Sequence, residues 1–430
     1  MSIAILSTGT ELLKGTILNT NAGFLCRRLA AAGLRPVLEL TAGDHPAEIT
    51  AALGDALRAA DTVLITGGLG PTRDDLTLDA VSRFFGLELE IDPLLAEKVE
   101  QFWSRRHEGR RAPKTVLRQA RVPHGATILP NANGSASGIR IDTEYGGRMR
   151  RIFLLPGPPA ELEPMAEESV IPAVAAYEAG AGHEYTQGFL AAGCGEYSVQ
   201  LRLEKLLRDR PVELAYCARP EGTRVFVSGS APAEVEAAVV EARTELGDAA
   251  LPAGSLDLVT AIATLLEERR LTLVTAESCT GGRIAGMLTD HAGISSVFKG
   301  GAVVYSNELK HTLLGVPEEL LARFGAVSAE CAEAMVCGAT ERLAADCAVA
   351  VTGIAGPGGG TPEKPVGLVY IAAKVGEELR VGEFHFSGDR RRVRESTAAR
   401  ALLLLFGLLS GKEGQTFLPP PQKSLRPEER

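Results

Sequence analysis

The sequence lacks a Cys-x-x-Cys pair, an N-terminal signal-peptide pattern, a long apolar run and an excess of basic residues. Its seven cysteines are scattered and odd in number, so we expect reduced thiols in a cytoplasmic protein rather than a disulfide framework. The apolar stretches are shorter or more interrupted than the roughly 20 residues that cross a bilayer, which predicts no membrane segment. A net charge of −9 argues against a protein that mainly coats nucleic acid, because phosphate binding needs a positive surface.

The chain is also too long for a single ordinary core. Its 430 residues predict more than one domain, since domains cluster at roughly 100–200 residues. Hydrophobic residues make up 45% and charged residues 23% of the chain, which is typical of globular proteins. We expect domains over residues 1–170, 179–251 and 256–410, joined at glycine-containing segments 180–182 and 252–254. Residues 411–430 are rich in Pro, Glu, Lys and Arg and are predicted to be disordered.

Short apolar runs alternate with amphipathic helices in the first and last of these regions. This alternation predicts βαβ units and mainly parallel sheets, and hence an α/β fold for both. In the first region we expect strands at 3–7, 34–40, 62–66 and 152–155 and helices at 21–32 and 47–60. In the last region we expect strands at 271–275, 301–305, 348–352 and 366–373 and helices at 259–269 and 393–409. The middle region is predicted as a small α+β unit, with strands at 185–190 and 223–228 and helices at 197–208 and 232–246.

The motif Thr-Ala-Glu-Ser-Cys-Thr-Gly-Gly at residues 275–282 lies where a predicted strand meets a helix. Ligands bind at such an edge of an open α/β sheet, because backbone N–H groups and the helix dipole point outward there. A hydroxyl at this place, such as that of Ser278, can act as a nucleophile while neighbouring amides stabilise an oxyanion. The alternative is that Ser278 or Thr280 only caps the helix.

A nucleophilic serine needs a base, and the last region has few candidates. We interpret His291, His311 and His385 as surface or packing residues. Lys310 follows a predicted strand, and a desolvated lysine amine can accept the proton of a serine. The alternative for Lys310 is a solvated lysine on a helix.

A glycine-rich segment at residues 352–360 follows another predicted strand. Its glycines would allow backbone amides to approach a ligand closely, and phosphate suits such a loop. The segment matches neither a P-loop nor the G-x-G-x-x-G fingerprint, so a plain long turn is the alternative.

Five motifs occur in a fixed order in the last region: residues 276–282, residues 305–307 with Lys310, residues 325–328, residues 352–357 and residues 386–390. Together they resemble the C-terminal domain of the competence/damage-inducible protein A (CinA) family of nicotinamide mononucleotide deamidases, over about residues 257–409. The resemblance implies a cofactor-independent Ser-Lys amidase in which Ser278 attacks the carboxamide carbon and Lys310 takes its proton. Tyr305 would position or polarise the pair.

The same resemblance implies a set of substrate contacts: Glu277, Cys279, Thr280, Gly281, Thr352, Gly353, Ile354, Ala355, Gly356 and Arg390. Arg390 is a candidate partner of the substrate phosphate, and its alternative role is a surface salt bridge. Cys279 is the rival nucleophile because a thiol is intrinsically more reactive. We prefer Ser278 because the family implies a Ser-Lys pair.

A second glycine-rich motif at residues 66–77 follows a predicted strand of the first region. It supplies Gly67, Gly68, Gly70, Thr72, Asp74 and Asp75. The glycines open the backbone to a phosphate, and the two aspartates could hold a divalent cation, whereas the alternative is a turn that Asp75 caps. Glu11 and Asp44 are expected at the same edge of the sheet.

With residues 9–15, 19–22 and 155–159, this motif resembles the three-layer MoaB/MogA-type molybdopterin-binding fold, as found in the N-terminal domain of the CinA family. The resemblance covers about residues 1–165 and implies metal-dependent hydrolysis of ADP-ribose. Asp44 and Asp75 are the leading metal ligands, ahead of Glu11 and Asp74. The segment 134–138 departs from the family pattern, because Ser135 and Ser137 stand where Thr and Pro are typical.

A basic run lies between residues 103 and 121 and contains Arg105, Arg106, Arg110, Arg111, Lys114, Arg118 and Arg121. We interpret it as a solvated face, and a lid over a diphosphate is the alternative. The middle region resembles the KH-like insert of the CinA family, with residues 193–197 at its first turn, but has no clear Gly-x-x-Gly loop for RNA. We therefore interpret this KH-like region as a spacer and candidate dimer contact.

The leading hypothesis for the whole chain is a cytoplasmic, homodimeric hydrolase of pyridine-nucleotide recycling with two active sites. Its partners would be small nucleotides, with no membrane and no direct nucleic-acid contact. The first alternative is a molybdopterin-binding protein with an inactive C-terminal domain. The second is a binding protein of competence or recombination, against which the acidic balance argues.

Overall fold

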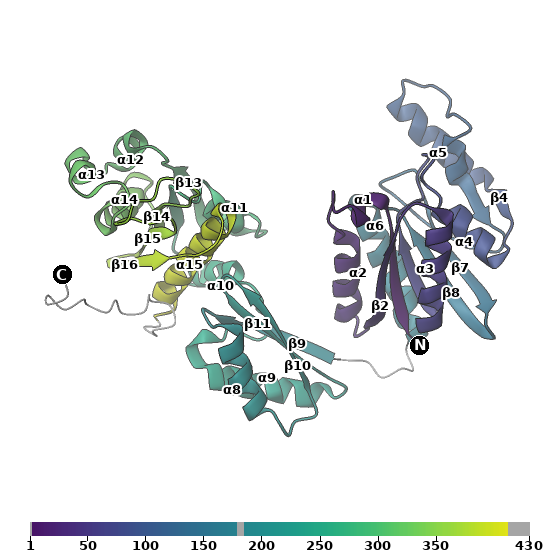
Figure 1. Ribbon diagram of the computed structural model, residues 1–430, viewed down its shortest axis with the longest axis horizontal. Coiled ribbons are helices and arrows are strands. Elements are labelled where there is room, and N and C mark those ends of the chain that lie inside the picture. The colour runs from purple at the N-terminus through teal and green to yellow at the C-terminus, as the bar shows by residue number, and fades with distance from the viewer. Residues whose placement is uncertain (1, 179–184, 412–430) are drawn as a thin grey trace. The chain divides into compact units, whose positions relative to one another are not determined.

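The computed structural model describes residues 2–178 and 185–411. The chain forms two compact units, an N-terminal unit (residues 1–186) and a C-terminal unit (residues 187–430), which we describe separately (Figure 1). The predicted joint at 180–182 and residues 412–430 of the predicted disordered tail lie outside the described residues. Within the described part of the chain, no helix combines the length and the apolar character that a membrane crossing requires.

The N-terminal unit is built on a six-stranded sheet of order β2-β1-β3-β8-β7-β6. Its parallel strands are β1 (Ile3–Thr8), β2 (Pro36–Ala42), β3 (Thr62–Thr66) and β8 (Arg148–Leu155), while β7 (Gly138–Tyr145) pairs antiparallel with β8 and with β6 (Thr127–Leu129). Strands β1 and β3 are buried along their whole length, which explains their continuous apolar sequences. The predicted parallel sheet is confirmed.

Helices cover both faces of this sheet and make three layers (Figure 1). On one face, α3 (Pro46–Ala59) and α4 (Thr77–Phe85) pack Leu53 and Val81 against the strands. On the other face, α2 (Thr20–Ala31), α6 (Pro159–Met165), η2 (Ala166–Val170) and α7 (Ile171–Glu178) bury Leu29 and Met165. A short helix, α1 (Thr10–Leu13), follows β1. The expected α/β class and three-layer architecture are confirmed.

One substructure of this unit was not predicted from the sequence. A two-stranded ribbon of β4 (Leu89–Ile91) and β5 (Arg121–Pro123) joins with α5 (Pro93–Arg106) and the 3-10 helix η1 (Val116–Ala120). Leu95, Ala120 and Val122 form its small core. The basic run of the sequence lies on α5, on the loop that follows it, on η1 and on the first residue of β5.

The first part of the C-terminal unit is a three-stranded sheet of order β10-β11-β9. It consists of β9 (Tyr185–Ala192), β10 (Glu213–Arg219) and β11 (Gly222–Gly229), with α8 (Glu196–Leu206), α9 (Pro232–Leu246) and the short η3 (Gly247–Ala249). The expected α+β elements are present, and β10 is an additional strand. Leu190 and Leu251 pack into the core of the following sheet, so these parts form one compact unit, and the predicted boundary between 251 and 256 remains a prediction.

A five-stranded sheet of order β13-β12-β14-β15-β16 forms the rest of the C-terminal unit. The strands β12 (Leu273–Glu277), β13 (Phe298–Val303) and β14 (Cys347–Gly353) are parallel, and β15 (Leu368–Val375) and β16 (Glu378–His385) are antiparallel. The sequence predicted four of these strands, shifted by a few residues for β13 and β15, and missed β16.

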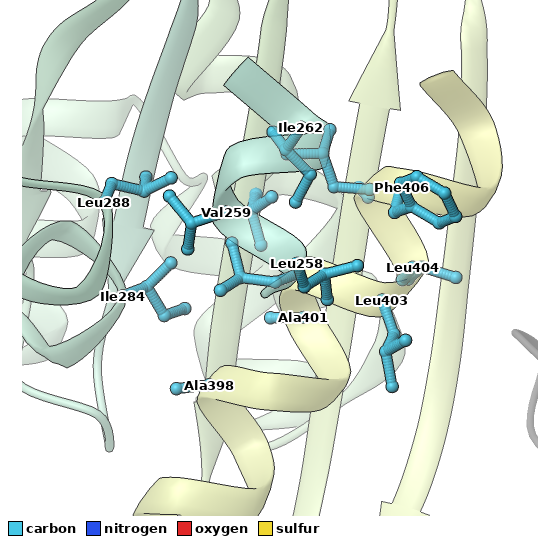
Figure 2. Close-up of a cluster of buried hydrophobic side chains, with 14 of the residues drawn as sticks. Leu258, Val259, Ile262, Ile284, Leu288, Ala398, Ala401, Leu403, Leu404 and Phe406 are labelled. Carbon is cyan, nitrogen blue, oxygen red and sulfur yellow. The ribbon is translucent and has the colours of Figure 1, made fainter. Parts of the chain in front are cut away.

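Helices also cover both faces of this second sheet. On one face, α10 (Leu258–Arg269), α11 (Arg283–Thr289) and α15 (Arg390–Ser410) meet in an apolar cluster that includes Ile262, Ile284 and Leu404 (Figure 2). The other face is covered by α14 (Ala329–Arg342), with α12 (Asn307–Leu314) and α13 (Glu318–Phe324) beside it. The short helix η4 (Ile294–Ser296) precedes β13. Because β12 is paired with a parallel strand on each side, its carboxyl end lies between the carboxyl ends of β13 and β14, at one edge of the sheet.

Candidate active sites

Ser278 directly follows β12 and lies between the carboxyl ends of β13 and β14. The last residue of β12, Glu277, is opposite Val303 of β13 and Val351 of β14, so the three parallel strands end side by side. The Ser278 amide donates to the Val351 carbonyl at 3.1 Å, which fixes the backbone at the strand end. Ser278 is 8% exposed and is therefore buried below the protein surface.

Lys310 approaches Ser278 from the neighbouring strand connection. Its amine nitrogen lies 3.2 Å from the Ser278 hydroxyl oxygen, and it donates to the carbonyls of Val304 at 2.9 Å and Tyr305 at 3.3 Å. The residue is 1% exposed, and burial lowers the pKa of its amine. In the structure the nitrogen donates to all three oxygens, and when the amine is neutral the same geometry lets its lone pair face the Ser278 hydroxyl and accept the proton.

The start of α12 fixes the place of Lys310. Ser306 caps the helix, because its hydroxyl accepts from the Leu309 amide at 3.1 Å. The cap puts Lys310 in the first turn with its side chain directed back toward the sheet, which is why the side chain is buried on an otherwise exposed segment. The predicted alternative of a solvated lysine is wrong.

Glu277 supports the loop between β12 and α11. It is fully buried, and its carboxylate accepts from the amides of Gly282, Ile284 and Ala285 at 2.8–3.1 Å. The acceptor oxygens thus satisfy amides at the start of α11, which no other group of the helix can do. The structure places this predicted substrate contact inside the protein, underneath the loop.

Cys279 is buried beside the serine. It is 4% exposed, and burial raises the pKa of its thiol to about 12. A thiol with such a pKa carries almost no thiolate at neutral pH, which weakens its claim as a nucleophile. The backbone amides of Cys279 and Thr280, in contrast, donate to no backbone carbonyl within the described residues.

Arg394 is a residue of this site that sequence reasoning missed. From the second turn of α15 it donates to the carbonyls of Cys279 at 3.2 Å and Thr280 at 2.5 Å. Backbone carbonyls leave no signature in a sequence, and 115 residues separate Arg394 from Cys279. No pattern could therefore have indicated this contact.

Tyr305 and Arg390 meet at the rim of the same edge. Tyr305 is 60% exposed, and its hydroxyl accepts from the Arg390 guanidinium at 3.2 Å. Arg390 also donates to the Gly356 carbonyl at 2.8 Å, which connects it to the glycine-rich segment. Among the described residues the Tyr305 hydroxyl makes no hydrogen bond with Ser278 or Lys310; Tyr305 contacts the lysine through its carbonyl.

The segment that begins at Thr352 is held in place by hydrogen bonds to the protein interior. Thr352 is 1% exposed and donates to the Ala326 carbonyl at 2.6 Å, so its hydroxyl is not directed to an open site. The Ile354 amide donates to the Leu368 carbonyl, and Ala355 and Gly356 are buried. Gly356 has φ of +79°, and a Cβ there would lie 2.6 Å from Val366, so only glycine fits.

The three histidines of this region lie elsewhere. His291 is near Thr260, His311 contacts the Val316 carbonyl at 2.9 Å, and His385 pairs with Glu383. None of these contacts involves Ser278 or Lys310. Their prediction as surface or packing residues agrees with these positions.

A second candidate site lies in the N-terminal unit, at the carboxyl ends of β1 and β3. The chain leaves β1 toward β2 on one side while β3 lies on the other, which is the switch point where ligands bind in open α/β sheets. A cavity of about 640 Å³ opens there. Predicted residues that line it are Glu11, Asp44, Gly67, Gly68, Gly70, Asp74 and Asp75.

Two glycines of this cavity are required by close contacts. Gly67 has φ of +100°, and a Cβ there would lie 2.4 Å from the Thr8 carbonyl oxygen. Gly68 has φ of +66°, and its Cβ would lie 2.1 Å from the Thr77 hydroxyl. Any side chain would therefore push the loop out of its place beside β1 and α4.

The aspartates of the cavity are held by the surrounding backbone. One Asp44 oxygen accepts from the Thr10 amide at 2.8 Å, and one Asp75 oxygen accepts from the Thr72 amide at 2.8 Å. The Thr72 hydroxyl also bonds Asp74 and lowers the pKa of its carboxyl. Thr72 does not line the cavity; it orients the two aspartates that do.

Several polar side chains of the cavity were missed in the sequence: Asn19, Asn21, Gln119, Ser135 and Glu161. Ser135, from the segment that departs from the family pattern, donates to Gln119 at 3.1 Å. The altered segment therefore still forms a wall of the cavity. Asn19 and Asn21 lie at the start of α2, which Asn19 caps; the sequence placed both in a family motif and did not predict them as cavity residues.

The carboxylates of this cavity suit a divalent cation only in part. Across residues 2–178 and 185–411, no three His, Cys, Asp or Glu side chains converge closely enough to hold a metal ion by themselves. Asp44 and Asp75 offer the hard oxygen ligands that magnesium prefers, and magnesium commonly completes its shell with water and substrate phosphates. The donor set therefore fits a cation that arrives with a phosphate-containing ligand.

The residues of the basic run fall into two groups, one ion-paired and one exposed. Arg118 and Arg121 form half-buried ion pairs with Asp79 at 2.9 and 2.8 Å, so they are neither a solvated face nor free for a lid. The residues from Arg105 to Lys114 are mostly exposed, as the solvated-face interpretation expects. No Lys, Arg or His belongs to the cavity lining within the described residues.

Comparison with known proteins shows similarity along both units. The model of the family described as CinA C-terminal domain matches residues 256–409, and that of a probable molybdopterin binding domain matches residues 4–176. A CinA-like protein of Geobacter sulfurreducens is 43% identical over 409 residues, which is 94% of this chain and 98% of the relative. A putative competence-damage inducible protein of Symbiobacterium thermophilum is 41% identical over 428 residues, 96% of this chain and 99% of the relative.

Solved structures also match part of the chain. A competence/damage inducible protein from Agrobacterium tumefaciens is 47% identical and covers 35% of this chain and 93% of its own, with a TM-score of 0.35.

Proposed function

The chain belongs to the CinA family and carries a MoaB/MogA-like N-terminal domain, and from this premise we propose that its C-terminal domain is a nicotinamide mononucleotide deamidase. The reaction is hydrolysis of the carboxamide to nicotinate mononucleotide and ammonia. The single observation that supports it best is the 3.2 Å contact between the buried Lys310 amine and the Ser278 hydroxyl. A buried lysine beside a serine at a sheet edge is expensive to maintain and is suited to nucleophilic catalysis.

In the proposed mechanism the Ser278 oxygen attacks the carboxamide carbon while the neutral Lys310 amine accepts the hydroxyl proton. The carbonyl oxygen of the substrate becomes an oxyanion, and we propose as its donors the amides of Cys279 and Thr280, which donate to no backbone carbonyl within the described residues. When the tetrahedral intermediate collapses, Lys310 returns the proton to the leaving nitrogen and ammonia departs. The acyl group remains on Ser278.

Water completes the cycle. Lys310, neutral again, accepts a proton from a water molecule that attacks the acyl carbon, and the Ser278 oxygen takes that proton as it leaves. The product is nicotinate mononucleotide, and no cofactor is needed for either half-reaction. For the substrate phosphate we propose Arg390 with the exposed glycines of the segment that follows Gly356.

For the N-terminal domain we propose hydrolysis of ADP-ribose to AMP and ribose 5-phosphate. The supporting observation is a cavity of about 640 Å³ at the switch point of the sheet, lined by Glu11, Asp44, Asp74, Asp75 and Glu161 and by glycine-opened backbone. A divalent cation held by Asp44 and Asp75 would neutralise the diphosphate and polarise it toward attack. Asp44 and Asp75 orient their oxygens through Thr10 and Thr72, as described above.

Two alternatives use the same features. The N-terminal cavity would also accept a molybdopterin, in line with the name of the matching family model, and the relatives' names point to competence or DNA damage. Incubation of the purified chain with nicotinamide mononucleotide and with ADP-ribose, with and without divalent metal, separates them. Ammonia from the first and metal-dependent AMP from the second support the proposal, whereas copurified molybdopterin without either product supports the first alternative.

Location and assembly belong to the same proposal. We propose a cytoplasmic homodimer; in support, all seven cysteines are free thiols, as a reducing compartment would keep them. Gel filtration with light scattering measures the subunit number. Salt-sensitive retention of the chain on DNA would favour the competence alternative.

A further inference from the structure

The contact of Arg394 with the nucleophile loop is not explained by the chemistry proposed so far. Its guanidinium lies on α15, half-buried, and donates to the carbonyls of Cys279 and Thr280. Within the described residues it forms no ion pair, although its neighbours Arg391 and Arg283 both pair with Glu395. A charged side chain whose donors go to two consecutive carbonyls controls the orientation of those peptide units.

Because a peptide unit is planar, a contact that fixes its carbonyl also fixes the direction of its N–H group. In a trans peptide unit the carbonyl and the N–H of the next residue point in opposite directions. The Ser278 carbonyl accepts from the Gly281 amide at 3.1 Å, which directs the Cys279 N–H away from that contact. The Cys279 carbonyl accepts from Arg394, which directs the Thr280 N–H to the opposite side.

We propose that Arg394 is a positioning residue that holds the Thr280 amide as an oxyanion donor; this inference rests on the proposed Ser278 chemistry. The orientation of one amide depends on a backbone contact, that of Gly281, and the orientation of the other depends on the Arg394 side chain. The positive charge on the carbonyl side also polarises the peptide unit, which makes its N–H a stronger donor. Arg394 acts through the backbone and touches neither the substrate nor the reacting atoms.

The competing explanation is that Arg394 only braces α15 against the loop. The two explanations differ in what they change. A brace contributes to stability and leaves the chemical step intact once the protein is folded. A positioning residue lowers kcat with little change in KM, because an oxyanion donor acts in the transition state and not on the bound substrate.

The test compares R394M, R394K and the control R391M in the full-length chain. Arg391 lies on the same helix, is 81% exposed and, within the described residues, forms its ion pair with Glu395 alone, so its removal changes the charge of the helix without touching the loop. We expect R394M to lower kcat for ammonia release from nicotinamide mononucleotide by about tenfold to a hundredfold, with KM within about threefold. R394K has a single ammonium in place of the guanidinium, whose several N–H groups reach both carbonyls. Its kcat should therefore lie between those of R394M and the wild type. R391M should match the wild type.

A second readout does not depend on the identity of the substrate. The burst of p-nitrophenol from p-nitrophenyl acetate measures acylation of Ser278, with S278A as the blank, and it should fall in R394M in parallel with kcat. If the wild type shows the burst but releases no ammonia from the mononucleotide, the substrate proposal fails and the Arg394 inference is still judged by the burst.

Three results would overturn the inference. The first is an R394M burst and kcat equal to those of the wild type. The second is a loss confined to KM. The third is a lower thermal unfolding temperature for R394M combined with no rescue by R394K. In that case R394K, although folded normally, would show no larger burst and no higher kcat than R394M. Absence of any burst in the wild type would overturn both the Ser278 chemistry and the inference built on it.

Discussion

The amine of Lys310 lies 3.2 Å from the hydroxyl of Ser278, and its remaining hydrogen bonds go to two backbone carbonyls. Within the described residues it forms no ion pair with a carboxylate, and the groups that raise the pKa of its amine are the thiols of Cys331 and Cys279. Burial outweighs them and lowers the pKa. Burial therefore shifts the protonation equilibrium of the amine toward its uncharged form, which is the form that can accept a proton.

This relationship predicts the pH dependence of ammonia release. Only the neutral amine accepts the serine proton, so kcat/KM should rise with pH through the pKa of Lys310 in the free enzyme. Because burial lowers this pKa, the rise should be centred below the ordinary lysine value of about 10.4. A pH–rate profile measures the centre, and a rise centred at or above the ordinary value would contradict the assignment of Lys310 as base.

Replacement of the base by another cation separates proton transfer from charge. K310R keeps a positive charge that does not titrate in the accessible pH range, so ammonia release should fall by at least about a hundredfold at every pH. Steady-state kinetics over the same pH range as the wild-type profile follow the change. An arginine variant with wild-type kcat would show that a fixed charge, and not a base, is what the site needs.

The buried carboxylate of Glu277 should be essential for the loop. E277A removes the acceptor of three amides at the start of α11 and should lower the free energy of unfolding by about 2–4 kcal/mol, together with ammonia release. E277Q retains one acceptor oxygen and should be less destabilising. Urea unfolding measures both. Equal stability of E277A and the wild type would mean that the loop does not depend on this carboxylate.

Two glycines with nearly the same φ provide a matched test of the N-terminal cavity. Gly68 and Gly86 have φ of +66° and +69°, but a Cβ at Gly68 would lie 2.1 Å from Thr77, whereas Gly86 has open space around it. G86A should cost about 1 kcal/mol of stability from φ strain alone and leave AMP formation from ADP-ribose unchanged. G68A should cost more and abolish AMP formation, because the loop that lines the cavity must move.

If G68A and G86A have the same effect on both measurements, the tight fit of Gly68 beside Thr77 has no role in the site.

Whether a contact of the site could be predicted from the sequence depends on the kind of contact it is. Ser278 and Lys310 could be predicted to meet because each follows one of two parallel strands, and the register of β12 with β13 confirms that these strands end together. The direction of a side chain is set by local packing and could not be predicted in the same way. Glu277 and Thr352 are turned into the protein for this reason, although both belong to the family motifs.

The contacts that escaped prediction involve backbone acceptors or distant chain segments. Arg394 donates to carbonyls, and Arg390 donates both to the Gly356 carbonyl and to the hydroxyl of Tyr305, which is 85 residues away in the sequence. The ribbon of β4 and β5 with α5 also escaped, because its strands are three residues long and carry no alternating pattern. Ion pairing of Arg118 and Arg121 with Asp79 depends on this ribbon and could not be expected without it.

The metal dependence of the N-terminal domain can be examined through binding as well as turnover. D75N removes a carboxylate charge from a cavity lined by five carboxylates and should weaken binding of manganese in the presence of ADP-ribose, measured by electron paramagnetic resonance, as well as AMP formation. D92N, in which Asp92 caps α5, is the control, since that residue does not line the cavity. Equal manganese binding by D75N and D92N would remove Asp75 from the proposed ligands.

The central claim is that Ser278, and not the neighbouring thiol, deamidates nicotinamide mononucleotide. Burial that raises the pKa of Cys279 to about 12 leaves the thiol protonated, while Lys310 is in contact with the serine. Ammonia release from nicotinamide mononucleotide, measured side by side for the wild type, S278A and C279A, tests this claim most directly. The account predicts ammonia from the wild type, none above background from S278A and most of the wild-type rate from C279A. Release of ammonia by S278A together with its loss in C279A would contradict it.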